Sequence, residues 1–434
     1  MQSQRQTLMS LLLFGVVVVL VVVWISSRNS IAVPSQGEWW AIQDATIISM
    51  NPKDPESFKG TVLGRGDTIV KVDAQVKLPK NTKVISGVGK ILTPGIALAG
   101  TRLGLVEISL EGSTRNDSKP GRAQLRPGFR VFDGFNYTSS LIPIARVEGV
   151  TSVIVQPYGG LLSGQSALVD LYGSSEQMKV QSPLAVHARI PVGRSAFAWL
   201  KLREAFAEAK LYTTYKSQYH RRKVRELHMS HLDLEALSQV VNQKVPLVLE
   251  VHRASDILTA LRFAETYGIK LMLEGVSEGW QVAEAIARSK TPVFVGPPNN
   301  LPSRFDRLGN RYDNAALLHR AKVKLAFSSQ GDAHNIRSMR HEAGIAMAWG
   351  LPSHEALKAL THNVYTFFGL QKRYGSLKRG QMANIVMWNG DPLEMSSRAL
   401  QVWIRGKQIP MVSRQTLLRD RYKSLKNLYR LPTQ

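Results

Sequence analysis

The chain of 434 residues has no cysteine. This absence excludes disulfide bridges, zinc–thiolate sites, cysteine nucleophiles and anchoring through a lipid-modified cysteine. Acidic residues are scarce too, because 32 Asp and Glu face 56 Lys and Arg and leave a formal net charge of +24. Such a charge favours anionic partners such as phospholipid headgroups, acidic polysaccharide or nucleic acid, and a generally basic solvated surface is the alternative explanation.

The sequence also lacks the glycine-rich fingerprint of dinucleotide-binding folds and the G-x-x-x-x-G-K phosphate loop. Its hydrophobic content of 44% is ordinary for a globular protein with a full core. The length accommodates one large domain with a smaller satellite, or two medium domains.

One apolar run, Met9 to Ile25, carries no charge and is just long enough to span a bilayer core. We therefore predict that residues 1–37 form a membrane anchor and a linker, with a cleaved signal peptide as the alternative. The basic groups around the run, Arg5 before it and Arg28 after it, slightly favour a cytoplasmic N-terminus. In a bacterium, a single-pass anchor of this kind would place the body on the periplasmic side of the inner membrane.

The rest of the chain divides into segments with different patterns of predicted secondary structure. Residues 38–91 and 371–410 consist of short segments typical of antiparallel strands, and we expect them to join as one composite β-sandwich. Residues 92–370 alternate short apolar strands with amphipathic helices, which is typical of a parallel sheet covered by helices. The number of repeats favours a closed (β/α)8 TIM-like barrel over an open doubly wound sheet, so the predicted fold class is α/β.

Two segments are strongly basic. Residues 189–225 interleave Arg and Lys with aromatic residues, but no nucleic-acid-binding module is present. We interpret this segment as two solvated helices that cover the barrel and bind no nucleic acid, with an anionic membrane as the alternative partner. Residues 411–434 place Leu418 and Tyr422 at helical spacing among basic residues, which predicts an amphipathic helix that packs on the body or lies on an anionic membrane.

A series of short motifs follows in a fixed order along the chain: Leu92-Thr93-Pro94-Gly95, Gly149-Val150-Thr151-Ser152-Val153, the glycine-rich loop 159–167, the stretch 300–316, and Gly375-Ser376-Leu377 with Ala383-Asn384-Ile385-Val386. Together they resemble the imidazolonepropionase-like branch of the amidohydrolase superfamily. Members of that family hold one or two divalent metal ions, usually zinc, at the C-terminal mouth of the barrel. The resemblance therefore implies a hydrolase that acts on non-peptide carbon–nitrogen bonds through metal-bound water.

The ligand positions implied by the resemblance carry unsuitable residues. Gly100 and Arg102 stand at the two histidines of the first strand, Gly275 stands at the sixth-strand histidine, and Gln330 replaces the aspartate after the eighth strand. A guanidinium repels a divalent cation, and fewer than three protein ligands do not hold zinc. We therefore expect no metal cofactor, and we take Arg102 as a candidate ligand for an anion or a carboxylate.

His252, at the end of the predicted fifth strand, is the one preserved candidate ligand, unless the register slips by two residues onto Glu250. A rebuilt site is a further hypothesis, in which Asp332, His334 and His187 join His252 at the barrel mouth. The alternative is that Asp332 caps the following helix, His334 faces solvent, and the two other histidines are structural.

Three functions remain as hypotheses. The first is a hydrolase with a reduced or relocated metal site. The second is a catalytically silent homologue that binds a small-molecule ligand or a partner, such as an intact amidohydrolase relative or another copy of the chain. The third is an envelope protein whose basic surface binds anionic lipid or polymer. The residues at the ligand positions favour the second function, and the resemblance favours the first.

Overall fold

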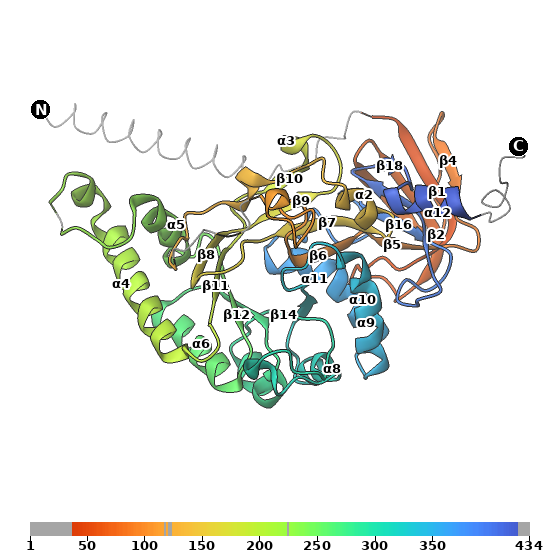
Figure 1. The fold of residues 1–434 in the computed structure, drawn as a ribbon. Helices are drawn as coiled ribbons and strands as arrows, with labels where there is room; N and C mark the ends of the chain where they lie inside the picture. Colours follow the sequence, from red (N-terminus) through yellow and green to blue (C-terminus); the bar gives the residue numbers. More distant parts are fainter. Residues whose placement is uncertain (1–36, 117–118, 120–123, 224, 424–434) are drawn as a thin grey trace, which may run out of the picture. The chain divides into compact units, whose positions relative to one another are not determined.

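The larger part of the chain closes into an α/β barrel (Figure 1). Ala99 and Ser328 form a parallel bridge that joins the last strand of the barrel to the first. The strands are, in order around the barrel, β6 (Ile96–Thr101), β7 (Val150–Val155), the consecutive pair β9 (Ala167–Asp170) and β8 (Leu162–Gln165), β11 (Val186–Arg189), β12 (Leu247–Val251), β13 (Leu271–Gly275), β14 (Val293–Val295) and β15 (Leu325–Phe327).

This computed structural model describes residues 37–434 except for 117–118, 120–123, 224 and 424–434. The predicted membrane anchor, Met9 to Ile25, lies outside the described residues. Within the described ranges, no helix is both long enough and apolar enough to span a bilayer.

The barrel is not parallel throughout, so the predicted (β/α)8 arrangement is wrong at one place. The strand β9 runs antiparallel to β7, and β8 runs antiparallel to β11. Only the residues 156–161 connect β7 to β8, and Gly159 and Gly160 among them have positive φ angles. A parallel crossover needs a dozen or more residues, whereas so short a glycine-containing connection reverses the chain as a hairpin.

Side chains fill the barrel interior, so its lower part is a packed core and not a channel. Nearly every strand of the barrel contributes an apolar residue to this core. These inward-facing residues include Ala97, Ala99, Ile154, Leu168, Ala185, Val248, Met272, Phe294 and Ala326. Polar side chains begin above this apolar layer, toward the carboxyl ends of the strands.

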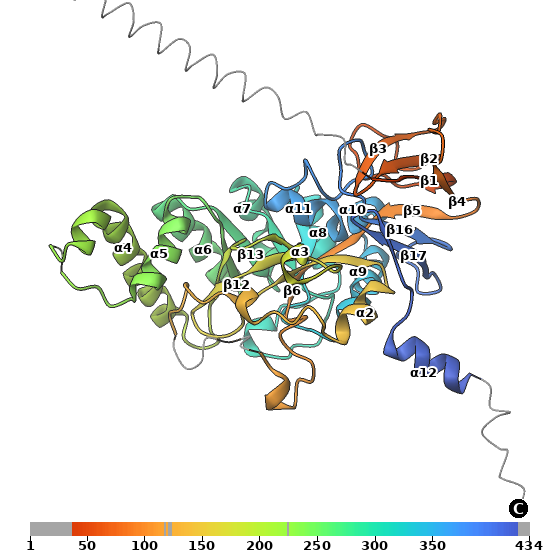
Figure 2. The ribbon, with the colours of Figure 1, turned by 90° about the horizontal axis from the view of Figure 1, so that it is seen from above.

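Helices cover the outside of the barrel (Figure 2). They are α2 (Leu141–Arg146), α3 (Ser175–Met178), α4 (Ser195–His220), α5 (His231–Val241), α6 (Ala254–Tyr267), α7 (Ala283–Arg288), α8 (Asn314–Arg320), α9 (Met339–Ala348), α10 (Ser353–Leu360) and α11 (His362–Phe367). Short 3-10 turns are η1 (Gly112–Thr114), η2 (Val131–Gly134), η3 (Gly279–Val282), η4 (Phe305–Arg307) and η5 (Ile336–Ser338). A small edge strand, β10 (Lys179–Gln181), pairs with β9.

The basic segment 189–225 contains the two helices expected from the sequence, which meet within α4 at a kink. Tyr215, whose backbone is non-helical, marks the kink. Trp199, Phe206 and Tyr212 are buried, as an inward-facing aromatic stripe requires, while Phe197 and Tyr215 are exposed. The segment therefore covers the barrel with only part of its aromatic residues.

Strands from both sides of the barrel in the sequence form one further sheet (Figure 1). The strand β16 pairs antiparallel with β5, which joins the two regions. The strands form one hydrogen-bonded series of eight, in which Thr68 also bridges Met382, and they enclose an apolar core of their own. Its strands are β1 (Trp39–Ile47), β2 (Phe58–Arg65), β3 (Thr68–Asp73), β4 (Lys83–Ser86), β5 (Ile91–Pro94), β16 (Ile385–Trp388), β17 (Ala399–Ile404) and β18 (Lys407–Ile409).

The basic C-terminal segment forms the helix α12 (Arg414–Tyr422), which begins at a capping box between Ser413 and Thr416. None of its residues is buried, and Leu417, Leu418 and Tyr422 are exposed. The predicted continuation of this helix to Arg430 lies outside the described residues.

A buried carboxylate ties the barrel to the small sheet. Asp170, on β9, is fully buried and accepts hydrogen bonds from Ser152 of β7, from Tyr374 and from Asn384 just before β16. Its Oδ2 also lies 2.7 Å from Nε of Arg405, between β17 and β18. One carboxylate therefore holds side chains from both parts of the fold.

We predict that Asp170→Asn lowers the free energy of unfolding by about 3–5 kcal/mol, because the guanidinium of Arg405 loses its charged partner in a buried setting. The thermal unfolding midpoint measures this effect. The matched control is Asp73→Asn, whose carboxylate pairs with Lys71 at the surface, where solvent screens the pair and its loss should change stability little. Equal losses in the two variants would contradict the assignment.

Candidate functional site

Two glutamates stand side by side at the carboxyl ends of neighbouring barrel strands. Glu250 on β12 and Glu274 on β13 occupy the same register of the parallel pair. Adjacent parallel strands direct such residues to the same face, so the two carboxyl groups share one local environment. The active sites of α/β barrels form at this end of the strands.

Glu250 is surrounded by cations. Its carboxylate lies 3.3 Å from Nε of Arg189, 3.5 Å from Nη2 of Arg304 and 3.7 Å from Nη2 of Arg307. Nε2 of His252 lies 3.2 Å from Oε1 of Glu250. Burial by itself would raise the pKa of Glu250, but the hydrogen bond from His252 and the neighbouring guanidinium charges outweigh it and hold this pKa below its ordinary value. Glu250 is therefore a permanent anion that anchors the cations around it.

Glu274 lies deeper, and none of the described basic side chains forms an ion pair with it. Its exposed fraction is 3%, and its carboxyl accepts hydrogen bonds from Ser328 and from the amide of Gln156. Burial and the adjacent charge of Glu250 raise the pKa of Glu274 to about 7, against the opposite effect of these hydrogen bonds. The mouth therefore contains one carboxylate that stays ionised and one that is half protonated near neutral pH.

The two glycines at the implied metal-ligand positions, Gly100 and Gly275, leave space that neighbouring polar side chains occupy. A Cβ at residue 100 would lie 1.9 Å from Oγ of Ser328 and 2.8 Å from Oε1 of Glu274. A Cβ at residue 275 would lie 2.4 Å from Cε1 of His252. Both glycines also have positive φ angles, which other residues adopt at a cost. At both positions, neighbouring groups occupy the space that a metal-binding side chain would need.

Arg102 takes part in a stack of cations on Tyr158. The guanidinium carbons of Arg102 and Arg189 lie 5.2 Å and 5.1 Å from the centre of this ring, and Nζ of Lys119 lies 5.5 Å from it. Nε of Arg102 donates to the backbone carbonyl of Gly331, directly after the implied aspartate position. These contacts join Arg102 to the cations around Glu250 through Arg189.

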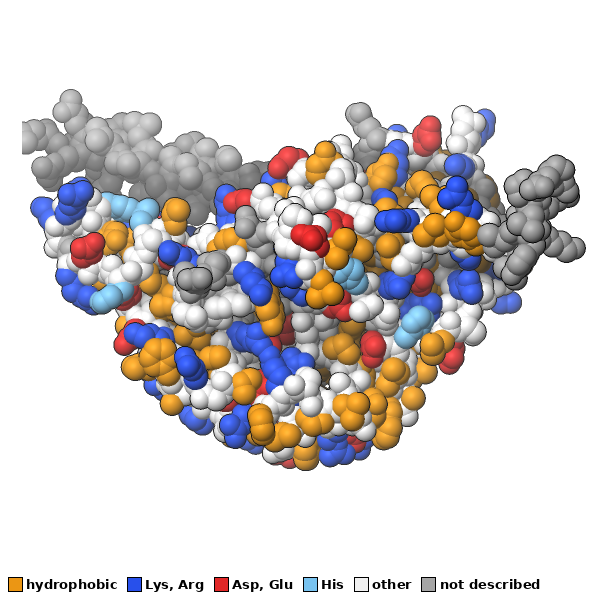
Figure 3. Space-filling view, viewed as in Figure 1, with side chains coloured by type: hydrophobic (Ala, Val, Ile, Leu, Met, Phe, Trp, Pro, Cys, Tyr) orange, Lys and Arg blue, Asp and Glu red, His pale blue; other side chains and the backbone are white. Residues whose placement is uncertain are grey.

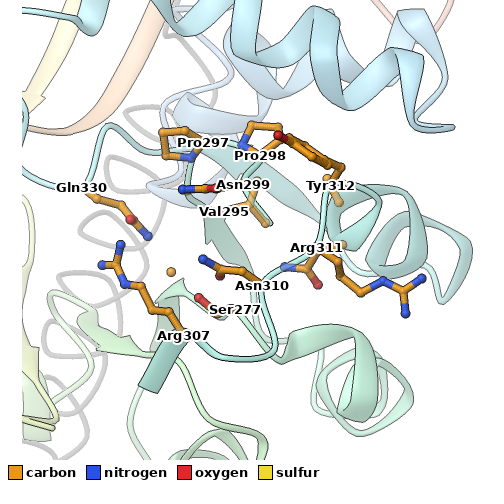
Figure 4. A pocket seen from close by; sticks show the side chains of 14 residues that line it. Ser277, Val295, Pro297, Pro298, Asn299, Arg307, Asn310, Arg311, Tyr312 and Gln330 are labelled. Carbon is orange, nitrogen blue, oxygen red and sulfur yellow. The ribbon is translucent and has the colours of Figure 1, made fainter. Parts of the chain in front are cut away.

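A cavity of about 140 Å³ opens beside this ionic cluster. Figure 4 shows Arg307, Gln330, Asn299 and Asn310 pointing into it, whereas the guanidinium of Arg311 points away. A second cavity of about 210 Å³ lies on the other side of His252, beside the loop 190–195 and Phe305. His252 lines this second cavity, whereas its contacts Ser277 and Arg307 line the first.

Cations exceed anions at the mouth. Four guanidinium groups lie here with three carboxyl groups. The cations belong to Arg102, Arg189, Arg304 and Arg307, and the carboxyls to Glu250, Glu274 and Asp306. Asp306 pairs with Arg304. Blue Lys and Arg side chains also outnumber red acidic ones on the face shown in Figure 3. The mouth is therefore suited to an anion.

The remaining predicted candidates have other contacts. Asp332 accepts hydrogen bonds from the backbone amides of His334 and Asn335, which form a turn within its own loop. The N-cap position of the following η5 is Asn335, so the predicted helix cap at Asp332 is wrong. His334 contacts the backbone carbonyl of Glu107 through Nε2. His187 is buried on β11, its Nε2 has no partner among the described residues, and burial lowers its pKa to about 3.

Across the described part of the chain, no three His, Asp or Glu side chains are placed to hold a metal ion together. His252 contacts Ser277 through Nδ1, and its Nε2 faces Glu250 and Arg307. The carboxylate of Glu250 is in turn within 4 Å of three guanidinium groups. A divalent cation requires ligands free of such competing charges, so this donor set does not fit the metal that the resemblance implies.

Sequence reasoning missed most of the residues in this cluster. It singled out His252 and Arg102, and it mentioned Glu250 as an alternative register, but it gave no role to Glu274, Arg304 or Arg307. A signal was present, because Leu-Val-Leu-Glu-Val and Leu-Met-Leu-Glu-Gly each place a glutamate near the end of an otherwise apolar strand. Acids at matching places on two buried strands indicate polar groups facing the barrel mouth.

Comparison with known proteins adds three findings. Residues 328–410 match the model of the amidohydrolase family. The chain is 22% identical over 389 residues to Amidohydrolase tasK of Hapsidospora irregularis, which covers 80% of this chain and 39% of that protein. The chain thus spans well under half of the length of that curated relative.

Solved structures show the same fold. An amidohydrolase from Thermotoga maritima MSB8 has a TM-score of 0.77 and 26% identity, covering 86% of this chain and 99% of that one. An adenosine deaminase from Xanthomonas campestris, solved with bound zinc, has a TM-score of 0.52 and 17% identity, with 92% of this chain and 100% of that one covered. The second likeness bears on the fold alone.

The raised pKa of Glu274 predicts a pH-dependent loss of stability. Between the ordinary pKa of a glutamate and about 7, the folded state keeps a proton on Glu274 that the unfolded state has released. The free energy of unfolding therefore falls as the pH rises through this window. A glutamine at this position carries no such proton, so Glu274→Gln lacks the contribution of residue 274 to the fall. We expect the variant to gain up to about 3 kcal/mol relative to the wild type between pH 4.5 and 8.

Thermal unfolding midpoints across this pH range measure the gain. The control is Glu265→Gln, at an exposed position on α6, whose difference from the wild type should not change over the same range. A constant difference between Glu274→Gln and the wild type would show that Glu274 does not hold this proton.

Proposed function

We propose that this chain, which belongs to the amidohydrolase superfamily, is a metal-free member whose barrel mouth binds an anionic small molecule without hydrolysing it. The observation that carries the proposal is that other residues stand at the implied metal-ligand positions. Two of them are glycines whose space is filled by Ser328, Glu274 and His252, and a third carries Arg102. The imidazolonepropionase-like branch remains the nearest description of the motifs.

A metal in this superfamily polarises the scissile carbonyl and lowers the pKa of a water molecule. The residues at this mouth provide other properties. Glu250 fixes the directions of Arg189, Arg304 and Arg307, and Tyr158 holds Arg102 and Arg189 on one ring. Guanidinium groups held in this way bind carboxylate or phosphate oxygens with little loss of side-chain freedom.

The neutral form of Glu274 contributes to the same role. A second ionised carboxylate beside Glu250 would offset much of the positive potential, whereas a protonated one does not. Burial keeps the proton on Glu274, because Ser328 and Gln156 both donate to this carboxyl and so favour its ionised form. The mouth therefore attracts an anion most strongly below the pKa of Glu274, near 7.

Two measurements test this function. Protein purified without chelator should contain less than about 0.1 equivalent of any divalent transition metal, because fewer than three protein ligands are available. Inorganic phosphate, titrated at constant ionic strength, should raise the unfolding midpoint of the wild type by about 2 °C or more. Arg102→Met should remove this shift, and Arg102→Lys should keep part of it.

The control is Arg288→Met, since Arg288 is exposed on α7 and pairs only with Glu284 within the described residues. It should respond to phosphate as the wild type does. Stoichiometric metal whose removal destabilises the protein, or turnover of an amide substrate that depends on added metal, would refute the proposal. A phosphate shift that is equal in all variants would refute the anion site.

We also propose that the protein is attached to the inner membrane with its body on the periplasmic side. The uncharged run from Met9 to Ile25, the net charge of +24 and the exposed Leu417, Leu418 and Tyr422 beside arginines on α12 support this location. Association with an intact relative or with a second copy of the chain is compatible with it.

Membrane fractionation tests the attachment. We expect the protein to remain in the membrane fraction after a wash with 1 M salt, which shortens the electrostatic screening length to about 3 Å. Detergent should release it. Deletion of residues 1–37 should move it to the soluble fraction. Release of the full chain by salt alone would mean that only charge holds it at the surface.

A further inference from the structure

We infer that the cavity beside Arg307 binds a compact carboxylate that also carries an amide or hydroxyl group. This inference rests on the proposed anion-binding function of the same mouth and specifies the ligand. The cavity holds about 140 Å³, close to the roughly 150 Å³ that accommodates a benzene molecule in an engineered core. A ligand of about six to ten non-hydrogen atoms fits such a space.

Arg307 supplies the carboxylate end. Its Nη2 lies 3.7 Å from Oε1 of Glu250 and 3.3 Å from Nε2 of His252, so the inner edge of the guanidinium is fixed. Its Nε is buried without a hydrogen-bond partner within the described residues, and the side chain points toward Gln330 in Figure 4. A guanidinium anchored on one side and free on the other presents donors to an incoming carboxylate.

Carboxamides supply the polar end. The side chains of Gln330 and Asn310 form no hydrogen bond to any described residue, and both line the cavity. Asn299 accepts the backbone amide of Leu301 through Oδ1, which leaves its Nδ2 available. A carboxamide offers both a donor and an acceptor, so a ligand with an amide or hydroxyl group satisfies these residues and an apolar ligand does not.

The backbone holds this arrangement in a strained form. Gln330 has a φ angle of 51°, and Val276, directly after Gly275, has a φ of 42°. A positive φ is unusual for glutamine and a real outlier for a β-branched residue. The missing side chain of Gly296 makes room for the amide of Gln330, since a Cβ there would lie 2.4 Å from Nε2. Such strain is concentrated at ligand-binding sites.

Two other polar residues of the cavity wall are already engaged. Asn314 accepts the backbone amide of Trp280 and donates to the carbonyl of Val276. The guanidinium of Arg311 pairs with Asp313, stacks 4.6 Å from the centre of the Trp280 ring and points out of the cavity (Figure 4). Arg311 therefore provides a matched control for Arg307, because it lines the same cavity without facing a ligand.

Calorimetric titration of the full-length protein with three probes of matched size tests the inference. N-acetylglycine has both the carboxylate and the amide, N-acetylglycinamide lacks the charge, and hexanoate lacks the amide. We expect N-acetylglycine to bind at least about tenfold more tightly than either comparator, because each comparator leaves a buried polar group unmatched.

Variants then assign the two ends of the ligand. Arg307→Met should weaken the binding of N-acetylglycine by about tenfold or more while leaving N-acetylglycinamide unchanged. Gln330→Met should remove the preference for N-acetylglycine over hexanoate. Arg311→Met should bind all three probes as the wild type does. Circular dichroism and the unfolding midpoint of each variant confirm that it is folded, and Arg307→Lys, which keeps the charge, should retain part of the affinity.

The outcomes separate this inference from the proposed function. If phosphate stabilises the protein through Arg102 but N-acetylglycine does not bind at about 10 mM, where even a millimolar site is occupied, the ligand class is wrong and the anion site stands. If neither probe binds, both are wrong. Equal losses in Arg307→Met and Arg311→Met, or equal affinity for hexanoate and N-acetylglycine, overturn the inference.

Discussion

The contact between Glu250 and the guanidinium groups around it organises the whole barrel mouth. Four basic residues would repel one another at this end of the strands if no anion lay among them. With Glu250 ionised, Arg189, Arg304 and Arg307 converge on one carboxylate, and Tyr158 carries Arg102 into the same cluster. Burial, together with this negative charge, raises the pKa of Glu274 to about 7. One buried ion thus holds the cations in place and adds to the rise in the pKa of its neighbour.

The glycines at the mouth belong to the same arrangement. An imidazole at residue 275 would occupy the space of His252, and one at residue 100 would displace the hydrogen bond between Ser328 and Glu274. Imidazoles at these two positions and the present contacts therefore require the same volume. The fold is similar to that of a solved amidohydrolase, while the residues at these strand ends form contacts of their own.

Much of the fold was accessible from the sequence because buried strands leave short apolar runs and helices leave amphipathic ones. The ends of β12 and β13 were placed correctly enough to put His252 and Gly275 at the mouth. The antiparallel turn into β8 was missed, since a strand within an apolar run does not record its direction. Arg304 and Arg307 were missed for another reason. They lie in the loop after β14, and only the packing of that loop against β12 brings them to Glu250.

The pairing of β16 with β5 has a consequence for how the chain reaches this state during synthesis. The first strands of the small sheet leave the ribosome before the barrel, and the last ones leave after it. The outer edge of β5 therefore stays without its neighbour until residues 385–388 have been made, although β1 pairs with its other edge. Unpaired strand edges are places where chains associate wrongly. The barrel inserted between the two halves of the sheet thus sets the interval during which the nascent protein is most exposed to aggregation.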